Sequence, residues 1–399
     1  MALTGSARRR VLIIVENLPV PFDRRVWSEA TTLNNAGYEV SIICPTGVGA
    51  MALEENIDGI HIYRHPLPIE ARKTFGFLAE YAVALFHELR LSFKIARRHG
   101  FDVIHACNPP DLICLVGLVH RLHGVKFIFD HHDLNPELYE AKFGRRDLFY
   151  HLLVFFERLT FRLSSISIAT NESYKQVAVS RGGMKEDRVF VVRSGPNLTR
   201  VKPVAAQDKW KNGREFMVGY VGVIGAQEGL DLLLESVTQI VRRRGRSDVQ
   251  FVIVGDGPER HRISEQSTAL GLDDYVTFTG RVDDATLMEV LSTADVCVNP
   301  DRPNPMNDKS TMNKIMEYMA LRKPIVQYDL TEGKASAQEA SLYAALTNPI
   351  DFSEKIIALL DDPVLREKMG DFGQQRVQDV LAWHHEAPKL LAAYDKIYE

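Results

Sequence analysis

The stretch VQFVIVGDGPER at residues 249–260 joins a near-continuous apolar run to a turn that contains two glycines. It predicts a strand, then a turn at Gly255-Asp256-Gly257-Pro258, then a helix with Asp256 as its cap and Pro258 in its first turn. A strand that is apolar throughout, and not only at every second residue, is typical of a parallel sheet covered on both faces. The turn would then lie in the crevice at the carboxyl ends of the strands.

The same pattern recurs along the whole chain. Before residue 193 the apolar runs are VLIIV, YEVSIIC, DVIHA, KFIFD, SISIAT and VFVVR, and after residue 210 they are FMVGYVG, VQFVIVG, YVTFTG, DVCVNP and PIVQYD. The stretch between them is polar and contains Gly195, Pro196 and Pro203, which indicates an interdomain linker. The length of 399 residues is also about twice that of one ordinary domain. We therefore expect an α/β protein with two doubly wound, Rossmann-like domains.

The domain boundaries follow from the linker. We expect residues 1–197 to form the first domain and residues 198–380 to form the second. The last helix, within residues 381–399, comes after a broken helical stretch, and we expect it to pack back on the first domain.

Composition narrows the class of protein. The net charge is −4, with 25% charged and 45% hydrophobic residues, which gives no indication of a nucleic-acid partner. Cys44, Cys107, Cys114 and Cys297 are scattered and form no CxxC pair, so we expect reduced thiols and no zinc site. The apolar run at residues 11–15 is too short for a signal-peptide core, and no run approaches the roughly 18 apolar residues of a membrane span. We expect a cytoplasmic protein.

Two helical patterns in the first half leave a membrane contact open. Residues 72–98 and residues 145–163 each combine an apolar stripe with several basic residues. Helices of this kind can lie on an anionic membrane surface, here the cytoplasmic face. The alternative is that both stripes belong to the ordinary core between helices and sheet.

Glycine-rich turns after three strands of the second half are candidates for binding a phosphate. Gly222 and Gly225 follow one strand, Gly255 and Gly257 follow the next, and Gly280 follows a third. Glycines allow a ligand to approach the backbone closely, and the helix that follows offers free N–H groups to an anion. Arg281 would then lie at the mouth of the crevice, where a guanidinium suits a diphosphate. The alternatives are plain tight turns and a surface arginine paired with nearby aspartates.

The stretch DKSTMNKIMEYMALRKP at residues 308–324 adds polar groups to an apolar helix. If the helix begins near Ser310 or Thr311, these hydroxyls can cap it or donate to a phosphate, and Lys309 and Lys314 bring positive charge. Glu317 comes later in the same predicted helix and has apolar neighbours in the sequence. A carboxylate there can accept two hydrogen bonds from the vicinal diol of a ribose.

A second basic group occurs in PFDRRVW, just after the first strand. Arg24 and Arg25 stand at a helix start, where the helix dipole does not favour cations. They either bind an anionic ligand or pair with Asp23 or Glu29 at the surface.

These motifs together resemble a known family. VGDGPE, FTGRV, ADVCVNP and KIMEYMALRKPIV, in this order, resemble the C-terminal half of the retaining glycosyltransferases of family 4, which have the GT-B fold. The segments at residues 11–45, DVIHACNPPD and FIFDHHDLNPE resemble the N-terminal half of such enzymes from bacterial polysaccharide assembly. The resemblance covers nearly the whole chain. It implies two Rossmann-like domains facing across a cleft, the second holding a nucleoside diphosphate sugar of UDP or GDP type and the first a lipid-linked or polysaccharide acceptor.

The resemblance also implies roles for individual residues. Glu317 matches the second glutamate of the E-x7-E motif, which holds the ribose, and His132 in DHHD matches a histidine that faces the donor sugar. His131 is the alternative, because alternation along a strand allows only one of the two to face the crevice. We therefore expect three groups of site residues. They are His132, Arg281 and Lys314 for catalysis; Gly222, Gly225, Asp256, Gly257, Gly280, Val282, Lys309, Ser310, Thr311 and Glu317 for the donor; and Asp23, Arg24, Arg25, His131 and Glu137 for the acceptor.

The chain departs from the family pattern at three positions. Lys309 stands where the first glutamate of E-x7-E binds the sugar hydroxyls, and Val223 and Glu228 stand where G-R-x4-K-G supplies two cations to the diphosphate. Our hypothesis is that Lys309, Lys314 and Arg281 supply the replacement charge. The chain contains no DxD motif, so we expect no metal and no other cofactor.

The function predicted from the sequence is therefore retaining transfer of a sugar to a cell-surface glycan acceptor. One alternative is a non-catalytic subunit that binds a nucleotide sugar within a glycan assembly complex, because the charges at three family positions are missing. A second alternative is a nucleotide-sugar epimerase of the same fold.

Overall fold

The computed structural model describes residues 9–47, 49–66 and 74–399, without the side chains of residues 74–81. The chain divides into two compact units. Unit 1 comprises Met1–Arg193 and Glu386–Glu399, and unit 2 comprises Ser194–His385. The sequence analysis placed the first boundary at residue 197 and the return of the chain at residue 381.

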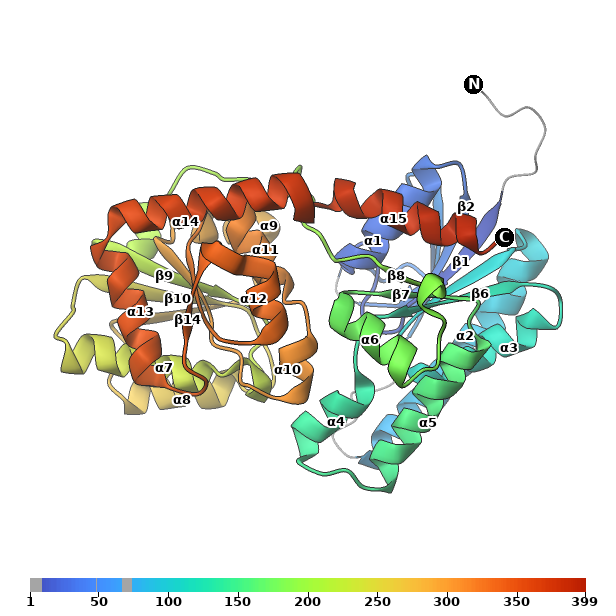
Figure 1. Cartoon of the computed structure of the whole chain (residues 1–399), viewed down its shortest axis with the longest axis horizontal. Coiled ribbons are helices and arrows are strands. Elements are labelled where there is room, and N and C mark those ends of the chain that lie inside the picture. Colours follow the sequence, from blue (N-terminus) through green and yellow to red (C-terminus); the bar gives the residue numbers. More distant parts are fainter. Residues whose placement is uncertain (1–8, 48, 67–73) are drawn as a thin grey trace. The chain divides into compact units, whose positions relative to one another are not determined.

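Unit 1 contains an eight-stranded sheet in the order β3-β4-β2-β1-β5-β6-β7-β8 (Figure 1). All neighbouring strands are parallel except β3 and β4, which form an antiparallel hairpin at one edge. The strands are β1 Arg10–Ile14, β2 Glu39–Pro45, β3 Glu54–Ile57, β4 Ile60–His65, β5 Val103–Cys107, β6 Lys126–His131, β7 Ile166–Ala169 and β8 Val189–Val191.

Helices cover both faces of the unit 1 sheet. They are α1 Arg24–Asn35, α2 Thr74–Arg98, α3 Cys114–Arg121, α4 Asn135–Phe143, α5 Leu148–Leu163, α6 Glu172–Ser180 and most of α15 Trp383–Lys396. Residues of α2, α3, α5 and α6 share one core with Phe127 and Phe129 of β6. Tyr394 of α15 instead contacts His105 of β5, whose neighbour Ile104 belongs to that core. Since side chains alternate along a strand, α15 packs on the opposite face.

Unit 2 contains six parallel strands in the order β11-β10-β9-β12-β13-β14. The strands are β9 Phe216–Val221, β10 Val249–Val254, β11 Val276–Gly280, β12 Val296–Asn299, β13 Ile325–Tyr328 and β14 Ser341–Ala344. The helices are α7 Leu230–Thr238, α8 Arg260–Ala269, α9 Asp284–Thr293, α10 Pro305–Lys309, α11 Asn313–Ala320, α12 Thr331–Ala337, α13 Pro349–Asp361 and α14 Pro363–Arg376. Two apolar cores fill the two faces of this sheet.

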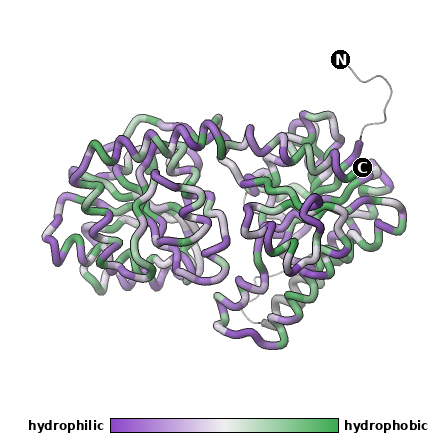
Figure 2. Tube along the Cα trace, viewed as in Figure 1, coloured by the Kyte–Doolittle hydropathy of each residue, from purple (hydrophilic) through white to green (hydrophobic). Residues whose placement is uncertain are grey.

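The predicted fold class is confirmed, because each unit is a doubly wound parallel sheet. Each apolar run in the sequence contains an observed strand, and the strands follow the hydrophobic segments of the chain (Figure 2). Strands β3, β4 and β14 were not predicted. In β3 the side chains are mostly exposed, so burial leaves no apolar run to recognise.

Two predicted helix starts were wrong. Helix α8 begins at Arg260, so Asp256 does not cap it; the Asp256 carboxylate instead accepts the neighbouring N–H of Gly257 at 2.8 Å. Helix α11 begins at Asn313, after the short helix α10 and a connection that contains Ser310 and Thr311. A turn at Pro258-Glu259 separates Asp256 from α8, and a short extended connection separates Ser310 from α11, neither of which local sequence preference reveals.

Backbone contacts join the turns after β9 and β10. The N–H of Gly222 donates to Val254 O at 3.1 Å, and the N–H of Ile224 donates to Asp256 O at 3.0 Å. Gly255 has φ +137°, and a Cβ at this position would lie 1.8 Å from Gly222 O. Both the backbone conformation and the space therefore require glycine at position 255.

We predict that Gly255→Ala destabilises unit 2 by about 3 kcal/mol or more, because the added methyl group forces these two turns apart. Gly245→Ala is the matched control, since Gly245 also has positive φ, +69°, but open space around its Cβ position. The control should lose only about 1 kcal/mol from backbone strain. Urea unfolding measures both, and equal losses would contradict the proposed role of the close approach.

Candidate functional site

The carboxyl edge of the unit 2 sheet is organised around Tyr318 of α11. The N–H of Val221, the last residue of β9, donates to the Tyr318 hydroxyl at 2.9 Å, and that hydroxyl donates to Val298 O of β12 at 3.3 Å. Tyr318 is fully buried. It therefore fixes the amino-terminal turns of α11 next to the turn that follows β9.

Lys314, in the first turn of α11, reaches the glycine turn after β9. Its Nζ lies 2.9 Å from the Asp301 carboxylate and 4.8 Å from the centre of the Tyr220 ring. A Cβ at Gly222 would lie 3.5 Å from the same Nζ. The structure thus brings together two predicted donor-site positions, Gly222 and Lys314, and adds Asp301 and Tyr220, which the sequence analysis did not single out.

Glu228 introduces a second carboxyl group at this turn. Burial raises its pKa to about 7, against the opposing effect of Lys314 and with a further increase from Asp301. Its Oε2 is buried without a hydrogen-bond partner, and a Cβ at Gly225 would lie 2.7 Å from that oxygen. The predicted phosphate turn therefore contains a carboxyl group that is largely protonated below about pH 7.

Glu317 lies one turn after Lys314 on α11, on the same side of the helix. Its Oε1 pairs with the guanidinium of Arg200, which also lies 3.5 Å from Asp284. Arg200 was not among the predicted site residues, because it stands in the polar stretch interpreted as a linker. Arg200 orients the carboxylate that was predicted to hold a ribose.

The turn after β11 presents Arg281 to solvent. Arg281 is exposed, and no ion pair or hydrogen bond joins its side chain to another residue in the part of the chain that the structure describes. Gly280 beside it has φ +70°, and Val282 packs against the core of unit 2. Asp283 caps α9 by accepting the N–H of Thr286 at 2.8 Å. Asp256, also exposed, lies 3.5 Å from Arg260.

The connection between α10 and α11 is more constrained than expected. The Ser310 hydroxyl is largely buried and donates to Met306 O at 2.8 Å, which satisfies its hydrogen within the protein. Lys309 ends α10, and Thr311 stands between the two helices. Neither Ser310 nor Thr311 begins α11. The prediction that their hydroxyls stand at the start of that helix was therefore wrong.

In unit 1, Asp23 and Arg25 are structural neighbours of the candidate histidine. Asp23 caps α1 by accepting the N–H of Val26 at 3.0 Å. The Arg25 guanidinium is buried and forms two hydrogen bonds with the Asp130 carboxylate, at 2.9 and 3.2 Å. Arg24, by contrast, is exposed. Arg25 is therefore not the surface cation that the sequence suggested.

His132 is held by the same carboxylate. It follows the last residue of β6, its side chain is 15% exposed, and its Nε2 lies 2.6 Å from Asp130 Oδ2. Burial would raise the pKa of Asp130, but the charge of Arg25 and the contacts with His132 and His105 hold that pKa well below its ordinary value. Asp130 is thus an ionised carboxylate in the protein interior.

His131 and Glu137 do not reach a surface. His131 points to the opposite face of the sheet, where the rings of Phe129, Phe161 and Tyr174 surround it and its Nε2 lies 3.4 Å from Glu157. Glu137 is buried and pairs with Arg181 at 2.7 and 3.1 Å. The alternation that the sequence analysis invoked therefore separates His131 from His132, and both buried side chains serve the interior of unit 1.

Two clusters of possible metal ligands occur in the described part of the chain. Glu29, His105, Cys107 and Asp130 form a buried cluster, but the Arg25 guanidinium already pairs with two of its carboxylates. The other cluster comprises Glu39, His61 and His99. In it the two ring nitrogens of His99 contact Tyr63 and Glu39, at 2.9 and 3.4 Å.

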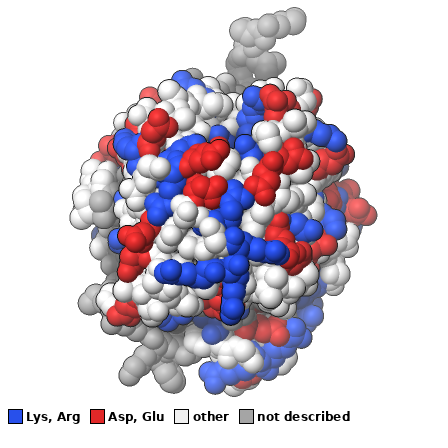
Figure 3. Space-filling view, turned by 90° about the vertical axis from the view of Figure 1, so that its left-hand side faces the viewer, with Lys and Arg blue, Asp and Glu red and all other residues white. Residues whose placement is uncertain are grey.

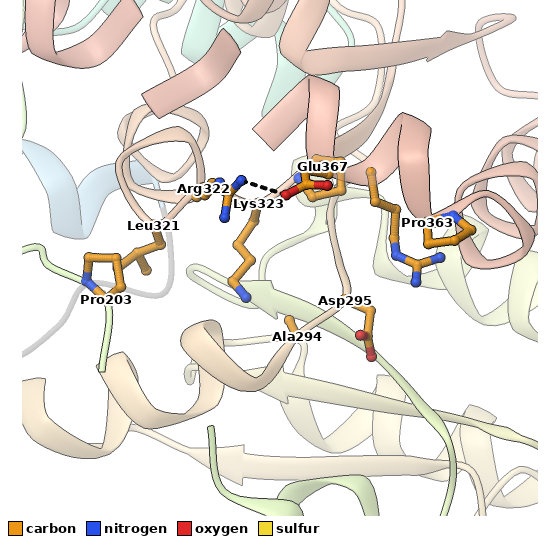
Figure 4. Close-up of a pocket in the computed structure, with 10 residues that line it drawn as sticks. Pro203, Ala294, Asp295, Leu321, Arg322, Lys323, Pro363 and Glu367 are labelled. Carbon is orange, nitrogen blue, oxygen red and sulfur yellow. Dashed lines mark hydrogen bonds and ion pairs between the residues drawn. The ribbon is translucent and has the colours of Figure 1, made fainter. Parts of the chain in front are cut away.

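A pocket of about 470 Å³ lies elsewhere in unit 2 (Figure 4). Its lining includes Asp295 and Pro324, which precede β12 and β13, so it lies at the amino ends of the strands. Arg322 there pairs with Glu367 (Figure 4), whereas Lys323 and Arg366 donate to backbone carbonyl oxygens. The pocket is therefore separate from the turns at the carboxyl edge. A face of unit 2 seen in Figure 3 shows basic and acidic side chains intermixed.

The four cysteines are all buried and unpaired, as expected for reduced thiols. Within the described residues, no helix has both the length and the apolar character that crossing a membrane would require.

Comparison with known proteins adds independent evidence. The model of the family described as Glycosyltransferase Family 4 matches residues 23–200, and the model described as Glycosyl transferases group 1 matches residues 215–362. Among relatives in Streptomyces kanamyceticus, alpha-D-kanosaminyltransferase is 34% identical, but the match spans only 39% of either chain. The 2-deoxystreptamine glucosyltransferase of the same organism is 24% identical over 85% of this chain and 88% of its own.

Solved structures share the fold. Sucrose-phosphate synthase from Thermosynechococcus elongatus superposes with a TM-score of 0.82 at 20% identity and covers 98% of this chain and 99% of its own. Anabaena HepE in complex with UDP-glucose has a TM-score of 0.71 at 14% identity and covers 97% and 99%. WaaG, a glycosyltransferase of lipopolysaccharide biosynthesis, has a TM-score of 0.70 at 13% identity and covers 96% and 99%. The solved structures show that the chain has the GT-B fold, and the two family models, which together match most of the chain, show that it belongs to the family 4 glycosyltransferases.

Proposed function

We propose that the protein transfers a sugar, with retention of configuration, from a UDP- or GDP-type nucleotide sugar bound by unit 2 to a lipid-linked or polysaccharide glycan acceptor bound by unit 1. The observation that carries this proposal is the placement of Lys314 beside the glycine turn after β9. Glu317 lies one helical turn further along α11, on the same side of the helix. A cation at the turn and a carboxylate one helical turn further suit a diphosphate and a ribose. Anabaena HepE, which has the same fold, binds UDP-glucose.

Transfer requires stabilisation of the departing diphosphate. As the bond between the sugar and the phosphate breaks, negative charge grows on the diphosphate, and fixed cations and N–H groups lower the barrier. Lys314 is held in place by Asp301, and Arg281 is an unpaired cation in the described part of unit 2. These two residues perform this role in the proposal without a metal or another cofactor.

Glu228 makes the charge of the site depend on pH. The positive charge of Lys314 and the negative charge of Asp301 cancel. The net charge at the turn therefore depends on whether Glu228 is protonated. A protonated Glu228 can donate a hydrogen bond to a phosphate oxygen, whereas the ionised form repels it. The proposal is therefore that this acid takes part in donor binding in its protonated form.

An exposed apolar surface on unit 1 supports a membrane-associated acceptor. Val83, Phe86 and Phe93 of α2 and Leu148, Leu152 and Phe155 of α5 are all exposed. Helix α3 contacts both helices, and the neighbouring Arg90 and Arg162 are exposed and form no ion pair with any described residue. Exposed aromatic and basic side chains together fit the interface of an anionic bilayer. We propose peripheral contact with the cytoplasmic face of a membrane.

Transfer from a panel of radiolabelled nucleotide sugars to membrane lipid extract tests the proposed function. We predict that wild-type protein labels the lipid fraction with one donor and that His132→Ala lowers the rate about 100-fold, because the residue matched to the donor-facing histidine is lost. His123→Ala, at an exposed position before β6, is the control and should retain full activity. Free epimerised sugar nucleotide, or binding without turnover in the wild type, would contradict transfer.

A further prediction concerns Glu228→Gln. The raised pKa of Glu228, about 7 against an ordinary 4.5, means that its contribution to stability is complete below about pH 4.5 and is lost as the pH rises to about 7. At pH 8 the variant should exceed the wild type in unfolding free energy by up to roughly 3 kcal/mol, with little difference at pH 4.5.

Donor binding should follow the same titration. Wild-type affinity for UDP or GDP should fall between pH 6 and about pH 8, and Glu228→Gln should remove this dependence. Exposed Glu215→Gln is the control for both measurements. Melting curves and calorimetric titrations at the two pH values supply the data, and a parallel pH response in wild type and Glu228→Gln would contradict the assignment.

The last prediction for the proposed function concerns the membrane contact. The double substitution Phe86→Ser and Phe155→Ser should lower binding to vesicles that contain phosphatidylglycerol at least tenfold, because each buried aromatic side chain contributes about 1.5–3 kcal/mol. Val364→Ser, which replaces a 74% exposed residue of α14 in unit 2, is the control. Vesicle co-sedimentation measures binding. Equal binding by the double variant and the wild type would exclude this surface as the contact.

A further inference from the structure

The C-terminal helix α15 has a direct hydrogen-bonded connection to the candidate donor-facing histidine. We propose that Tyr394 is a positioning residue that sets the orientation and tautomer of His132 through His105 and Asp130. This inference rests on the proposed function, because it treats His132 as the residue of unit 1 that meets the donor sugar. It assigns a role to α15 beyond packing.

The connection consists of three contacts. The Tyr394 hydroxyl lies 2.8 Å from His105 Nδ1, His105 Nε2 lies 3.2 Å from Asp130 Oδ2, and His132 Nε2 lies 2.6 Å from the same oxygen. Tyr394, His105 and Asp130 have no exposed surface. The link therefore runs through the interior of unit 1, from the helix to the end of β6, and water does not interrupt it.

The direction of each hydrogen bond follows from the charge of Asp130. An ionised carboxylate only accepts, so His105 and His132 must both donate to it from Nε2. Burial lowers the pKa of His105, which keeps its ring neutral, so its Nδ1 carries no proton and accepts from the Tyr394 hydroxyl. In neutral His132 the proton is then fixed on Nε2, and Nδ1 is left free to accept.

Arg25 contacts the same two atoms. Its Nε lies 3.2 Å from Asp130 Oδ2 and 2.8 Å from His132 Nε2. Arg25 Nε can donate to His132 Nε2 only when that nitrogen carries no proton, so when His132 donates to Asp130 the Arg25 Nε–H is left to the carboxylate. Arg25 Nη1 also donates to Val192 O at 2.8 Å, which holds the guanidinium against the sheet.

The remaining groups around Asp130 leave the cluster near neutrality. Glu29 of α1 faces it and lies 3.2 Å from the Arg25 guanidinium, and burial raises the pKa of Glu29 well above its ordinary value, which favours the uncharged acid. Cys107 of β5 lies 4.0 Å from Asp130 Oδ2, and burial raises the pKa of its thiol, which stays uncharged. Arg25 and Asp130 are then the charged pair, and the Tyr394 hydroxyl supplies the donor for Nδ1 of His105 while Nε2 faces that pair.

Tyr394→Phe is the decisive variant. It retains the ring that packs against Tyr38 at 5.5 Å and removes only the hydroxyl that donates to His105. Without that donor, neutral His105 can place its proton on Nδ1, and Asp130 then loses one of its two imidazole donors. Tyr398→Phe is the matched control, because Tyr398 lies just after the same helix and contacts Arg9 through its ring.

Two measurements on full-length protein test the proposal. The first is the set of ring 15N chemical shifts of His105 and His132 in protein labelled at histidine, with His132 assigned by comparison with His132→Ala. The second is the pH profile of kcat for transfer, together with KM for the donor. Tyr394→Phe should move the His105 and His132 ring shifts and lower kcat about tenfold with KM nearly unchanged, while Tyr398→Phe resembles the wild type.

The outcomes separate this inference from the proposed function. Unchanged His132 ring shifts in Tyr394→Phe would overturn the inference, even if the wild type is an active transferase. A lower melting temperature with unchanged ring shifts and an unchanged pH profile would show a purely structural role and would also overturn it. If the wild type transfers no sugar, the ring shifts still decide whether Tyr394 controls His132. Asp130→Asn, which removes the shared acceptor, should move the same His132 shifts in folded protein.

Discussion

The ion pair between Arg25 and Asp130 is the interaction on which the first half of the protein depends. Asp130 has no exposed surface, and the free-energy cost of burying its charge is offset by two hydrogen bonds from the guanidinium and by the two histidines. Loss of one partner from such a pair typically costs about 3–5 kcal/mol, because the other charge stays buried and unpaired. The pair joins α1 to β6, which the candidate histidine His132 follows directly, and His105 links β5 to the same carboxylate.

The second half depends on a constraint of a different kind. In a parallel sheet the carboxyl ends of all strands share one edge, so the turns after β9, β10 and β11 meet there. Backbone hydrogen bonds join these turns, from Gly222 to Val254 and from Gly255 to Gly280. The resulting surface has glycine where backbone approaches backbone, and Tyr318 attaches α11 to it. The packing that stabilises unit 2 thus uses the N–H groups of Gly222 and Gly255 to hold the three turns together.

The strands and the family motifs could be predicted from sequence because their signals are local. Unbroken apolar runs reveal buried parallel strands, and glycine turns follow them at fixed positions. The roles of Arg200, Asp301 and Tyr394 could not be predicted, since each acts on a residue more than ten positions away in the chain. The alternation along β6 correctly separated His131 from His132, but burial of Arg25 and Glu137 required tertiary contacts that no local pattern reveals.

Glu228 shows how the departures from the family pattern can be compatible with a diphosphate site. An ionised carboxylate at the phosphate turn would oppose an anionic ligand, yet burial beside Asp301 raises the pKa of Glu228 to about 7 and so favours the neutral acid. A neutral carboxyl group offers a hydrogen-bond donor where relatives offer a cation. The change then replaces a charge–charge attraction by a directional hydrogen bond, while Arg281 is an exposed cation of unit 2 that forms no ion pair with a described residue. Donor affinity in this protein should accordingly be less sensitive to salt than in relatives with two cations at the turn, because a hydrogen bond from a neutral acid is not screened.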